Sequence, residues 1–204
     1  MTTIYLMRHS MVLKDINNDY NNESLQLQNE KMPLSIEGEE LASNISKESE
    51  LQNIDVVISS NYVRAMSTAK YIANANNVNL ILNSDFGERK FGINSWDELP
   101  SDFGLRQNND ENYKMGDGES QKEVRERVYK ALMKVIDEYR DKRVVIVSHG
   151  SAILWLLKQW CDVDLKNKCI TFNGKVILED NVYNCTTFKL EFDDKMLVNI
   201  EKVF

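Results

Sequence analysis

The sequence predicts one α/β domain over residues 1–204, with α/β/α layers around a mostly parallel central sheet. Short apolar runs alternate along the chain with segments whose apolar residues recur every three or four positions, as strands alternate with amphipathic helices. No internal repeat and no linker-like stretch divides the chain. Its 204 residues, 42% of them hydrophobic, are enough to bury one sizeable core.

Strands are expected at four apolar runs bounded by polar or turn-forming residues. These runs are residues 3–7, 55–59, 80–82 and 143–148. The end of the chain is expected to add a hairpin made of 182–190 and 196–203, which turns at Asp193 and Asp194.

Four helices are expected from start signals and from apolar stripes. One begins at Ser35, and another begins with the capping box of Ser120 and Glu123. The inward faces of the four are, in chain order, Gly38, Leu41, Ala42 and Ile45; Tyr62, Ala65, Met66, Ala69, Ile72 and Ala73; Val124, Val128, Ala131, Val135 and Tyr139; and Ile153, Leu154, Leu157 and Trp160. Residues 14–31 form a long polar stretch, and 84–119 are expected to be irregular.

Composition excludes several classes of function. A net charge of −7 argues against a nucleic acid or an anionic membrane as partner, because both require a basic face. Three cysteines, Cys161, Cys169 and Cys185, match no paired metal or redox spacing, so free thiols in a reducing cytoplasm are expected. The first strand leaves no room for a signal peptide, and no apolar run approaches membrane-spanning length. Neither a metal nor a cofactor is expected.

Both histidines of the chain lie where an apolar run ends. His9 follows the first strand directly after Arg8, and His149 follows the strand 143–148. Arg64 comes one helical turn after the second strand, and Glu88 comes after the third. If these strands are parallel, all five side chains meet at one edge of the sheet, where helix N-termini also point. Guanidinium groups and helix N-termini suit a phosphoryl group.

The residues in these positions resemble the histidine phosphatase superfamily, the phosphoglycerate mutase-like enzymes. The matches run in family order from residue 4 to about residue 154. They are Arg8-His9-Ser10, 34–38 (Leu-Ser-Ile-Glu-Gly), 59–69 (Ser-Ser-Asn-Tyr-Val-Arg-Ala-Met-Ser-Thr-Ala), 88–92 (Glu-Arg-Lys-Phe-Gly), Gly118-Glu119-Ser120 and Ser148-His149-Gly150. Each match alone is weakly specific, but six in order are strong support for a phosphoglycerate mutase-like fold.

The resemblance implies a role for each matching residue. His9 is expected to be the nucleophile that takes the phosphoryl group, and Arg8 and Arg64 are expected to clamp the phosphate oxygens. His149 is expected to donate a hydrogen bond to the same group. Glu88 is expected to protonate the leaving oxygen and then to deprotonate water, with Asp85, Asp97 and Glu98 as competing carboxylates in the same region. The arginines and His149 are expected to supply the charge that a metal ion supplies in many phosphoryl-transfer enzymes.

Ser10 and Gly150 complete the expected phosphate site, and two positions depart from the family pattern. Ser10 replaces the family's glycine: with a positive φ it would cost about 1–2 kcal/mol, and otherwise its hydroxyl is free to touch phosphate. Asp15 replaces an asparagine that contacts phosphate in many members, so that role is lost or moves to Asn17 or Asn18.

Three functions fit this pattern. The first is a metal-independent phosphatase for a small phosphorylated metabolite. The second is a phosphoglycerate mutase, which needs further cations around the site; Lys14, Lys31, Arg89, Lys90, Arg106 and Lys114 are candidates. The third is a non-catalytic phospholigand-binding protein. Phosphatase is favoured because water is the default acceptor when no second phosphate is held. Neither the natural substrate nor the oligomeric state is predicted.

Overall fold

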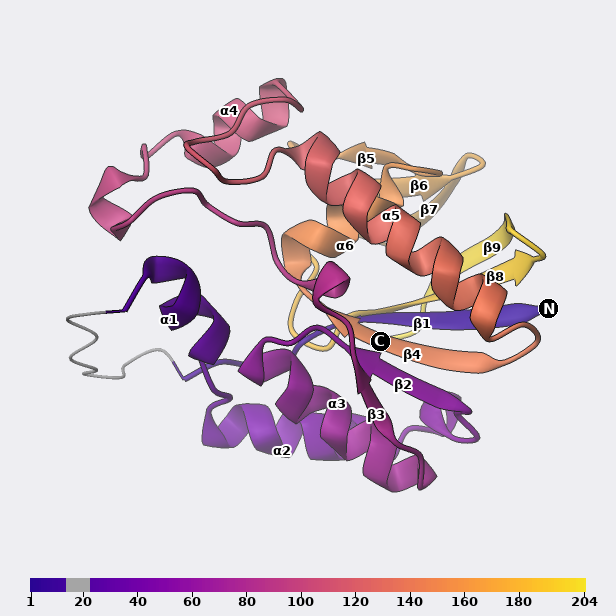
Figure 1. Cartoon of the computed structure of the whole chain (residues 1–204). Helices are drawn as coiled ribbons and strands as arrows, with labels where there is room; N and C mark the ends of the chain where they lie inside the picture. The colour runs from indigo at the N-terminus through magenta and orange to yellow at the C-terminus, as the bar shows by residue number, and fades with distance from the viewer. Residues whose placement is uncertain (14–22) are drawn as a thin grey trace.

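A computed structural model describes residues 1–13 and 23–204, and a six-stranded sheet forms their centre (Figure 1). The strands are β1 (Thr2–Arg8), β2 (Val56–Ser59), β3 (Leu80–Leu82), β4 (Arg143–Ser148), β8 (Thr187–Asp193) and β9 (Met196–Lys202). They lie in the order β3-β2-β4-β1-β8-β9. The pairs from β3 to β1 are parallel, and β8 and β9 add antiparallel pairs at one side. The predicted α/β fold with a mostly parallel central sheet is confirmed.

Helices cover both faces of this sheet. The α-helices of the described residues are α1 (Leu25–Lys31), α2 (Ile36–Ile45), α3 (Val63–Asn76), α4 (Phe103–Asn109), α5 (Gln121–Glu138) and α6 (Gly150–Leu157). In Figure 1, α2 and α3 lie on one face, and α5 and α6 lie on the other. Alternate side chains of β1 point to opposite helix layers. Tyr5 and Met7 pack with α3, whereas Ile4 and Leu6 pack with α5 and α6.

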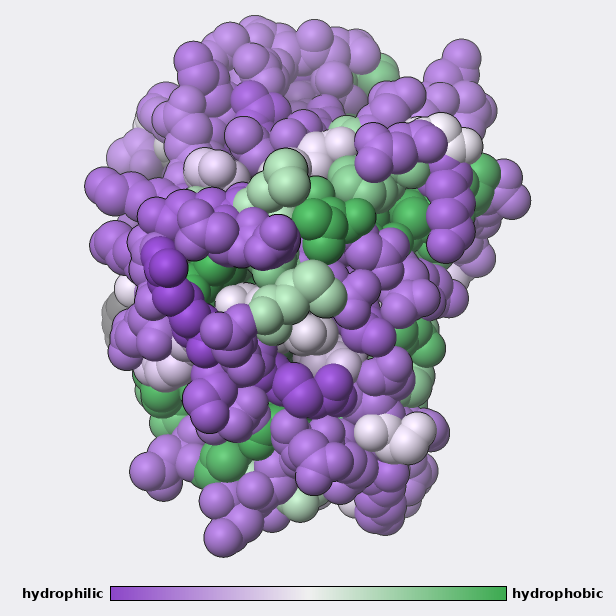
Figure 2. Space-filling model, turned by 90° about the vertical axis from the view of Figure 1, so that its right-hand side faces the viewer, coloured by the Kyte–Doolittle hydropathy of each residue, from purple (hydrophilic) through white to green (hydrophobic). Residues whose placement is uncertain are grey.

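The parallel strands β1 and β4 end side by side. Arg8 and Ser148 are partners at their carboxyl ends, and His9 and His149 follow them directly. Figure 2 shows the side of the molecule on which β1 begins, where the surface is mostly hydrophilic and the apolar patches are separated. None of the helices in the described ranges combines the length and apolarity that crossing a bilayer requires.

Two segments for which no helix was predicted contain helices. In the polar stretch, Ser24 caps α1 by accepting a hydrogen bond from the backbone N–H of Leu27 at 3.3 Å. The stretch 84–119 contains α4 and two short 3₁₀ helices, η2 (Ser84–Phe86) and η3 (Trp96–Glu98); a third, η1 (Ser49–Leu51), precedes β2.

The chain after α6 also differs from expectation. A second, three-stranded antiparallel sheet is formed by β5 (Asp162–Asp164), β6 (Cys169–Phe172) and β7 (Lys175–Glu179), which the sequence did not predict. The hairpin of β8 and β9 turns at Asp193 and Asp194 as predicted, but its first strand begins at Thr187 rather than at 182. Residues 182–186 instead bond to the loop after β1.

Candidate active site

The topology brings three of the expected side chains together at the carboxyl ends of β1, β2 and β4. His9 directly follows β1, and His149 is the N-cap residue of α6, directly after β4. Arg64 lies in the first turn of α3, which follows β2. The strand order places β4 between β1 and β2, so the three side chains converge, and all three are buried.

His9 presents a free lone pair on one ring nitrogen. Its Nδ1 lies 2.7 Å from the carbonyl oxygen of Ser10, which can only accept, so the proton is assigned to Nδ1. Its Nε2 then accepts from Nε of Arg64 at 3.1 Å. Burial, with the charges of Arg64 and Arg8, lowers the pKa of His9 to about 3. The imidazole is therefore neutral at physiological pH, with its nucleophilic atom facing Arg64.

His149 is held by two partners. Its Nδ1 lies 3.3 Å from Nη2 of Arg64, and because a guanidinium only donates, Nδ1 accepts. The proton then lies on Nε2, which is 2.8 Å from the hydroxyl oxygen of Ser60. Complete burial and the neighbouring charges hold the pKa of His149 well below its usual range. The two imidazole centroids are 5.1 Å apart, so the rings share one site.

The two arginines carry the positive charge of the site. Arg64 also donates from Nη1 to the carbonyl of Asn29 in α1 at 2.5 Å, and its guanidinium lies 4.8 Å from the centroid of the Tyr62 ring. Arg8 donates to the carbonyl of Val182 at 2.5 Å, and its Nε is buried without a hydrogen-bond partner among the described residues. Burial lowers the pKa of both arginines, and the charge of Glu88 opposes this shift in both.

Glu88 lies at the edge of this arrangement. One of its carboxylate oxygens accepts from the backbone N–H of Arg89 at 2.9 Å, and the other accepts from Ser151 N–H in the first turn of α6 at 3.4 Å. Glu88 lines a cavity of about 290 Å³ together with Asp85. The competing carboxylates Asp97 and Glu98 lie in the exposed η3 helix. Geometry therefore favours Glu88, with Asp85 second.

Ser10 is engaged with the protein rather than open to a ligand. Its φ is not positive, so the left-handed strain does not arise. Its hydroxyl donates to the carbonyl of Gly38 at 2.7 Å, and its backbone N–H donates to the hydroxyl of Thr68 at 2.9 Å. Gly150, the first residue of α6, lies against the guanidinium of Arg8. Asp15, Asn17 and Asn18 lie outside the described residues.

Three residues of the site were not identified as functional from sequence. Asn29 contributes a backbone carbonyl, which no side-chain motif signals. Thr68 holds both Ser10 and the α3 backbone, since its hydroxyl donates to the carbonyl of Arg64 at 2.8 Å. Asn184 donates to the carbonyl of His9 from 175 residues away in sequence. The sequence signal for Thr68 was its place in the 59–69 block; Asn29 and Asn184 had none.

The described residues contain no group of three or more histidine, cysteine, aspartate or glutamate side chains arranged to hold a metal ion. The candidate site is thus built from two neutral imidazoles, two guanidiniums and a carboxylate. This set offers a nucleophilic nitrogen, donors for phosphate oxygens and a group able to carry a proton.

Comparisons with known proteins agree with this geometry. The family model of the histidine phosphatase superfamily (branch 1) matches residues 4–177. The chain is 28% identical over 160 residues to a probable phosphoglycerate mutase GpmB of Salmonella arizonae, covering 75% of this chain and 72% of that protein. A mycobacterial glucosyl-3-phosphoglycerate phosphatase superposes with a TM-score of 0.71 at 17% identity, covering 99% of this chain and 97% of the other. A phosphoserine phosphatase from Entamoeba histolytica gives 0.67 at 18% identity, covering 98% and 97%.

Proposed function

The chain belongs to the histidine phosphatase superfamily, and from this premise we propose that it is a metal-independent phosphatase that hydrolyses a small-molecule phosphate monoester through a phosphohistidine on His9. The observation that carries the proposal is the unprotonated Nε2 of His9, which lies 3.1 Å from Nε of Arg64. Nucleophile and phosphate clamp are thus adjacent in a buried site. The reducing cytoplasm is the proposed location, since all three cysteines are free.

In the first step, Nε2 of His9 attacks phosphorus. The nitrogen–phosphorus bond forms as the bond from phosphorus to the alcohol oxygen breaks, and Glu88 donates a proton to that oxygen. Arg64 and Arg8 exchange their present partners for phosphate oxygens, because a dianion is a stronger acceptor than a neutral imidazole or a carbonyl. Their charge stabilises the transition state in place of a metal ion.

In the second step, water attacks the phosphohistidine. Glu88, now a carboxylate, accepts a proton from this water, the nitrogen–phosphorus bond breaks, and inorganic phosphate leaves. His149 donates a hydrogen bond to the phosphoryl group only after its proton moves to Nδ1. Ser60 permits this change, because its hydroxyl can donate to Nε2 of His149 as well as accept from it.

The cavity beside Glu88 favours a phosphatase over a mutase. The alcohol part of the substrate must lie beside the general acid, hence in this cavity. Its charged lining consists of Glu30, Asp85, Glu88 and Glu119 against Lys90 and Arg127. Arg127 is already neutralised, because it donates twice to Glu119, at 2.7 and 2.8 Å, and once to the carbonyl of Asp85 at 2.8 Å. A second phosphate group would find few cations here.

The cations considered for a mutase do not gather at this cavity. Among the described candidates, Lys90 alone lines it. Lys31 pairs with Glu23, Arg106 with Asp102 and Lys114 with Glu123. Arg89 lies over three aromatic rings and donates to Gln107 at 2.5 Å. Lys14 is outside the described residues. We therefore propose a substrate with a single phosphate and a neutral or cationic alcohol part.

The experiment follows the fate of the phosphate. Purified protein should hydrolyse para-nitrophenyl phosphate equally well with and without EDTA, and rapid acid-free quenching should trap an acid-labile phosphate on His9. His9→Ala should abolish both. Adding 3-phosphoglycerate with its bisphosphate should give no exchange of the phosphate position. Loss of activity in EDTA that Mg²⁺ restores would contradict metal independence. Phosphate exchange would establish the mutase, and binding without turnover would establish the non-catalytic alternative.

A further inference from the structure

We infer that Asn184 is a positioning residue, which fixes the tautomer and orientation of the nucleophile His9 through the carbonyl of Ser10. The inference rests on the proposed role of His9. Asn184 lies beyond residues 4–177, the part of the chain that matches the family model. It belongs to residues 182–186, here called the bracing segment, between β7 and β8.

The bracing segment holds the end of β1 and the loop that follows it, residues 9–11, here called the nucleophile loop. Backbone hydrogen bonds make this contact. The N–H of Arg8 donates to the carbonyl of Thr186, and the N–H of Cys185 donates to the carbonyl of Arg8, both at 3.0 Å. The carbonyl of Val182 accepts from the Arg8 side chain. The loop therefore meets this segment through main chain and side chain alike.

Asn184 adds the contact that reaches the nucleophile. Its side-chain Nδ2 donates to the carbonyl oxygens of His9 and Ser10, each at 3.0 Å. The Ser10 carbonyl is also the acceptor for Nδ1–H of His9 at 2.7 Å. One oxygen thus accepts from both side chains. By holding that carbonyl in place, Asn184 keeps the His9 proton on Nδ1 and the lone pair on Nε2.

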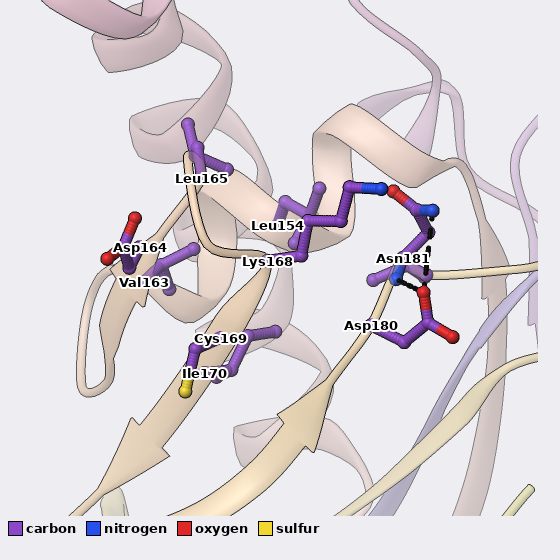
Figure 3. A pocket seen from close by; sticks show the side chains of 10 residues that line it. Leu154, Val163, Asp164, Leu165, Lys168, Cys169, Ile170, Asp180 and Asn181 are labelled. Atoms are coloured by element: carbon purple, nitrogen blue, oxygen red, sulfur yellow. Dashed lines mark hydrogen bonds between the residues drawn. The ribbon is translucent and has the colours of Figure 1, made fainter.

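The bracing segment is held by core packing at its start and by a turn into β8 at its end. Val182 is buried in the apolar cluster under α5 and α6 and lines a small cavity of about 80 Å³. Figure 3 shows this cavity between the loop that carries Lys168 and the segment of Asp180 and Asn181. Cys185 has a φ of 59°, a left-handed conformation unusual for a residue with a side chain, and β8 begins two residues later. The backbone reversal there turns the chain into β8 while Asn184 stays against the loop.

The role can be separated from simple packing by an isosteric change. Asn184→Asp keeps the size of the side chain but replaces its N–H donors with an oxygen that repels both carbonyls, and Asn184→Ala removes the donors without adding charge. Asn181→Asp is the matched control, because Asn181 is exposed and its side chain bonds to Asp180 and Tyr183. Outer partners that orient the histidines of metal sites are worth about 10–100-fold in affinity or activity, and we take the same range for this histidine. We expect that loss in the rate of His9 phosphorylation by para-nitrophenyl phosphate for both Asn184 variants, with the larger loss for Asp.

The direct readout is ¹⁵N NMR of the imidazoles, which is simple because the chain has two histidines. In the parent protein and in Asn181→Asp, His9 should show one tautomer, with Nδ1 protonated. The Asn184 variants should show a mixture of tautomers for His9 and unchanged His149 signals, which also prove that the variants are folded. An unchanged His9 tautomer in Asn184→Ala would overturn the inference, as would a parent-like phosphorylation rate in Asn184→Asp. If one variant does not fold, the other decides. If the parent protein forms no phosphohistidine, the proposed function is wrong. The tautomer of His9 in the Asn184 variants would still test the role of Asn184.

Discussion

At the scale of residues, Arg64 connects the whole site. Its Nε, Nη1 and Nη2 donate to His9, to the Asn29 carbonyl and to His149. A guanidinium presents these donors in one plane with fixed angles, so the positions of both imidazoles are tied to a single group. A lysine at this position would have the charge but could not make the same three bonds.

Glu88→Gln should slow hydrolysis of an alkyl phosphate by about 10²–10⁴-fold, because an alkoxide leaves poorly without a proton. Phosphorylation of His9 by an activated aryl phosphate should lose far less, since a stabilised phenolate needs no proton to leave. Rapid-quench measurement of the phosphorylation step with the two substrates tests this expectation.

Asp97→Asn is the matched control for that variant, because Asp97 is an exposed carboxylate in the same stretch of chain. Equal losses on both substrates in Glu88→Gln would show that Glu88 positions the phosphate without donating a proton. Asp85, which lines the same cavity, would then be the carboxylate to test.

The sequence predicted which side chains converge better than it predicted their hydrogen bonds. His9, His149 and Arg64 were brought together because strand ends and helix starts share an edge in a parallel sheet. The partner of Ser10 was not predictable, since it depends on how closely α2 approaches the loop after β1. The same holds for Asn184, whose contact requires the bracing segment to leave the sheet at a place where a strand was expected.

At the scale of elements, the approach of α2 to the loop after β1 depends on Gly38. A Cβ added there would overlap the carbonyl oxygen of Met11, two residues after His9. That same part of α2 holds the loop, since Gly38 accepts from the Ser10 hydroxyl and Ser35 N–H donates to Met11 at 3.0 Å. The absent side chain lets helix and loop touch.

Gly38→Ala should therefore destabilise the protein and disturb the site together. We expect the free energy of unfolding to fall by about 1–3 kcal/mol, the usual cost of overpacking, with a drop in activity because Met11 must shift. Urea unfolding and turnover of para-nitrophenyl phosphate measure the two effects.

Gly104→Ala is the matched control, because a Cβ at Gly104 in α4 meets nothing within 4 Å. Alanine is the better helix former by up to about 1 kcal/mol, so this variant should be as stable as the parent or more so. Similar losses of stability in the two variants would contradict the role given to Gly38.

The elements that the sequence predicted are those with long or regular apolar patterns, such as α5 with its capping box at Ser120 and Glu123. The elements it missed are short or polar. α1 has seven residues with Gln, Asn, Glu and Lys among them, and β5 has three residues. Such elements are stabilised by contacts with the rest of the chain, for example by the hydrogen bond from Gln26 to the Tyr62 hydroxyl at 2.7 Å. A local sequence pattern does not reveal these long-range contacts.

At the scale of the whole molecule, the site is a cationic pocket inside an acidic protein with a net charge of −7. Its two histidines are kept neutral by burial beside arginines. This arrangement keeps the lone pair of His9 unprotonated, but it also couples the stability of the fold to pH. Unfolded histidine has a pKa near 6.5, whereas the pKa of His9 in the fold is about 3.

The sign of this coupling follows from where the protons bind. Below pH 6.5 the unfolded chain takes up protons on both histidines while the folded protein does not, so acid favours unfolding. Above pH 6.5 both states are neutral at these positions and the contribution is constant. Between pH 6.5 and about pH 3, His9 should remove about 1.4 kcal/mol from the free energy of unfolding for each pH unit, and His149 should act in the same direction.

His149→Gln should reduce the pH dependence of the free energy of unfolding, because the unfolded variant binds one proton fewer in acid. Urea unfolding at several values between pH 7.5 and pH 4.5 should give a curve for the variant that is shallower than the parent's below pH 6.5, by at most about 1.4 kcal/mol per pH unit, the limit for one proton. Carboxylates with lowered pKa values, such as Glu123 and Asp137, also destabilise the fold in acid, but they are present in both proteins and cancel in the difference. Glu40→Gln, an exposed change on α2, controls for the effect of any substitution. Parallel curves for parent and His149→Gln would mean that His149 is protonated as readily in the fold as in the unfolded chain, and the neutral, Arg64-accepting imidazole would have to be abandoned.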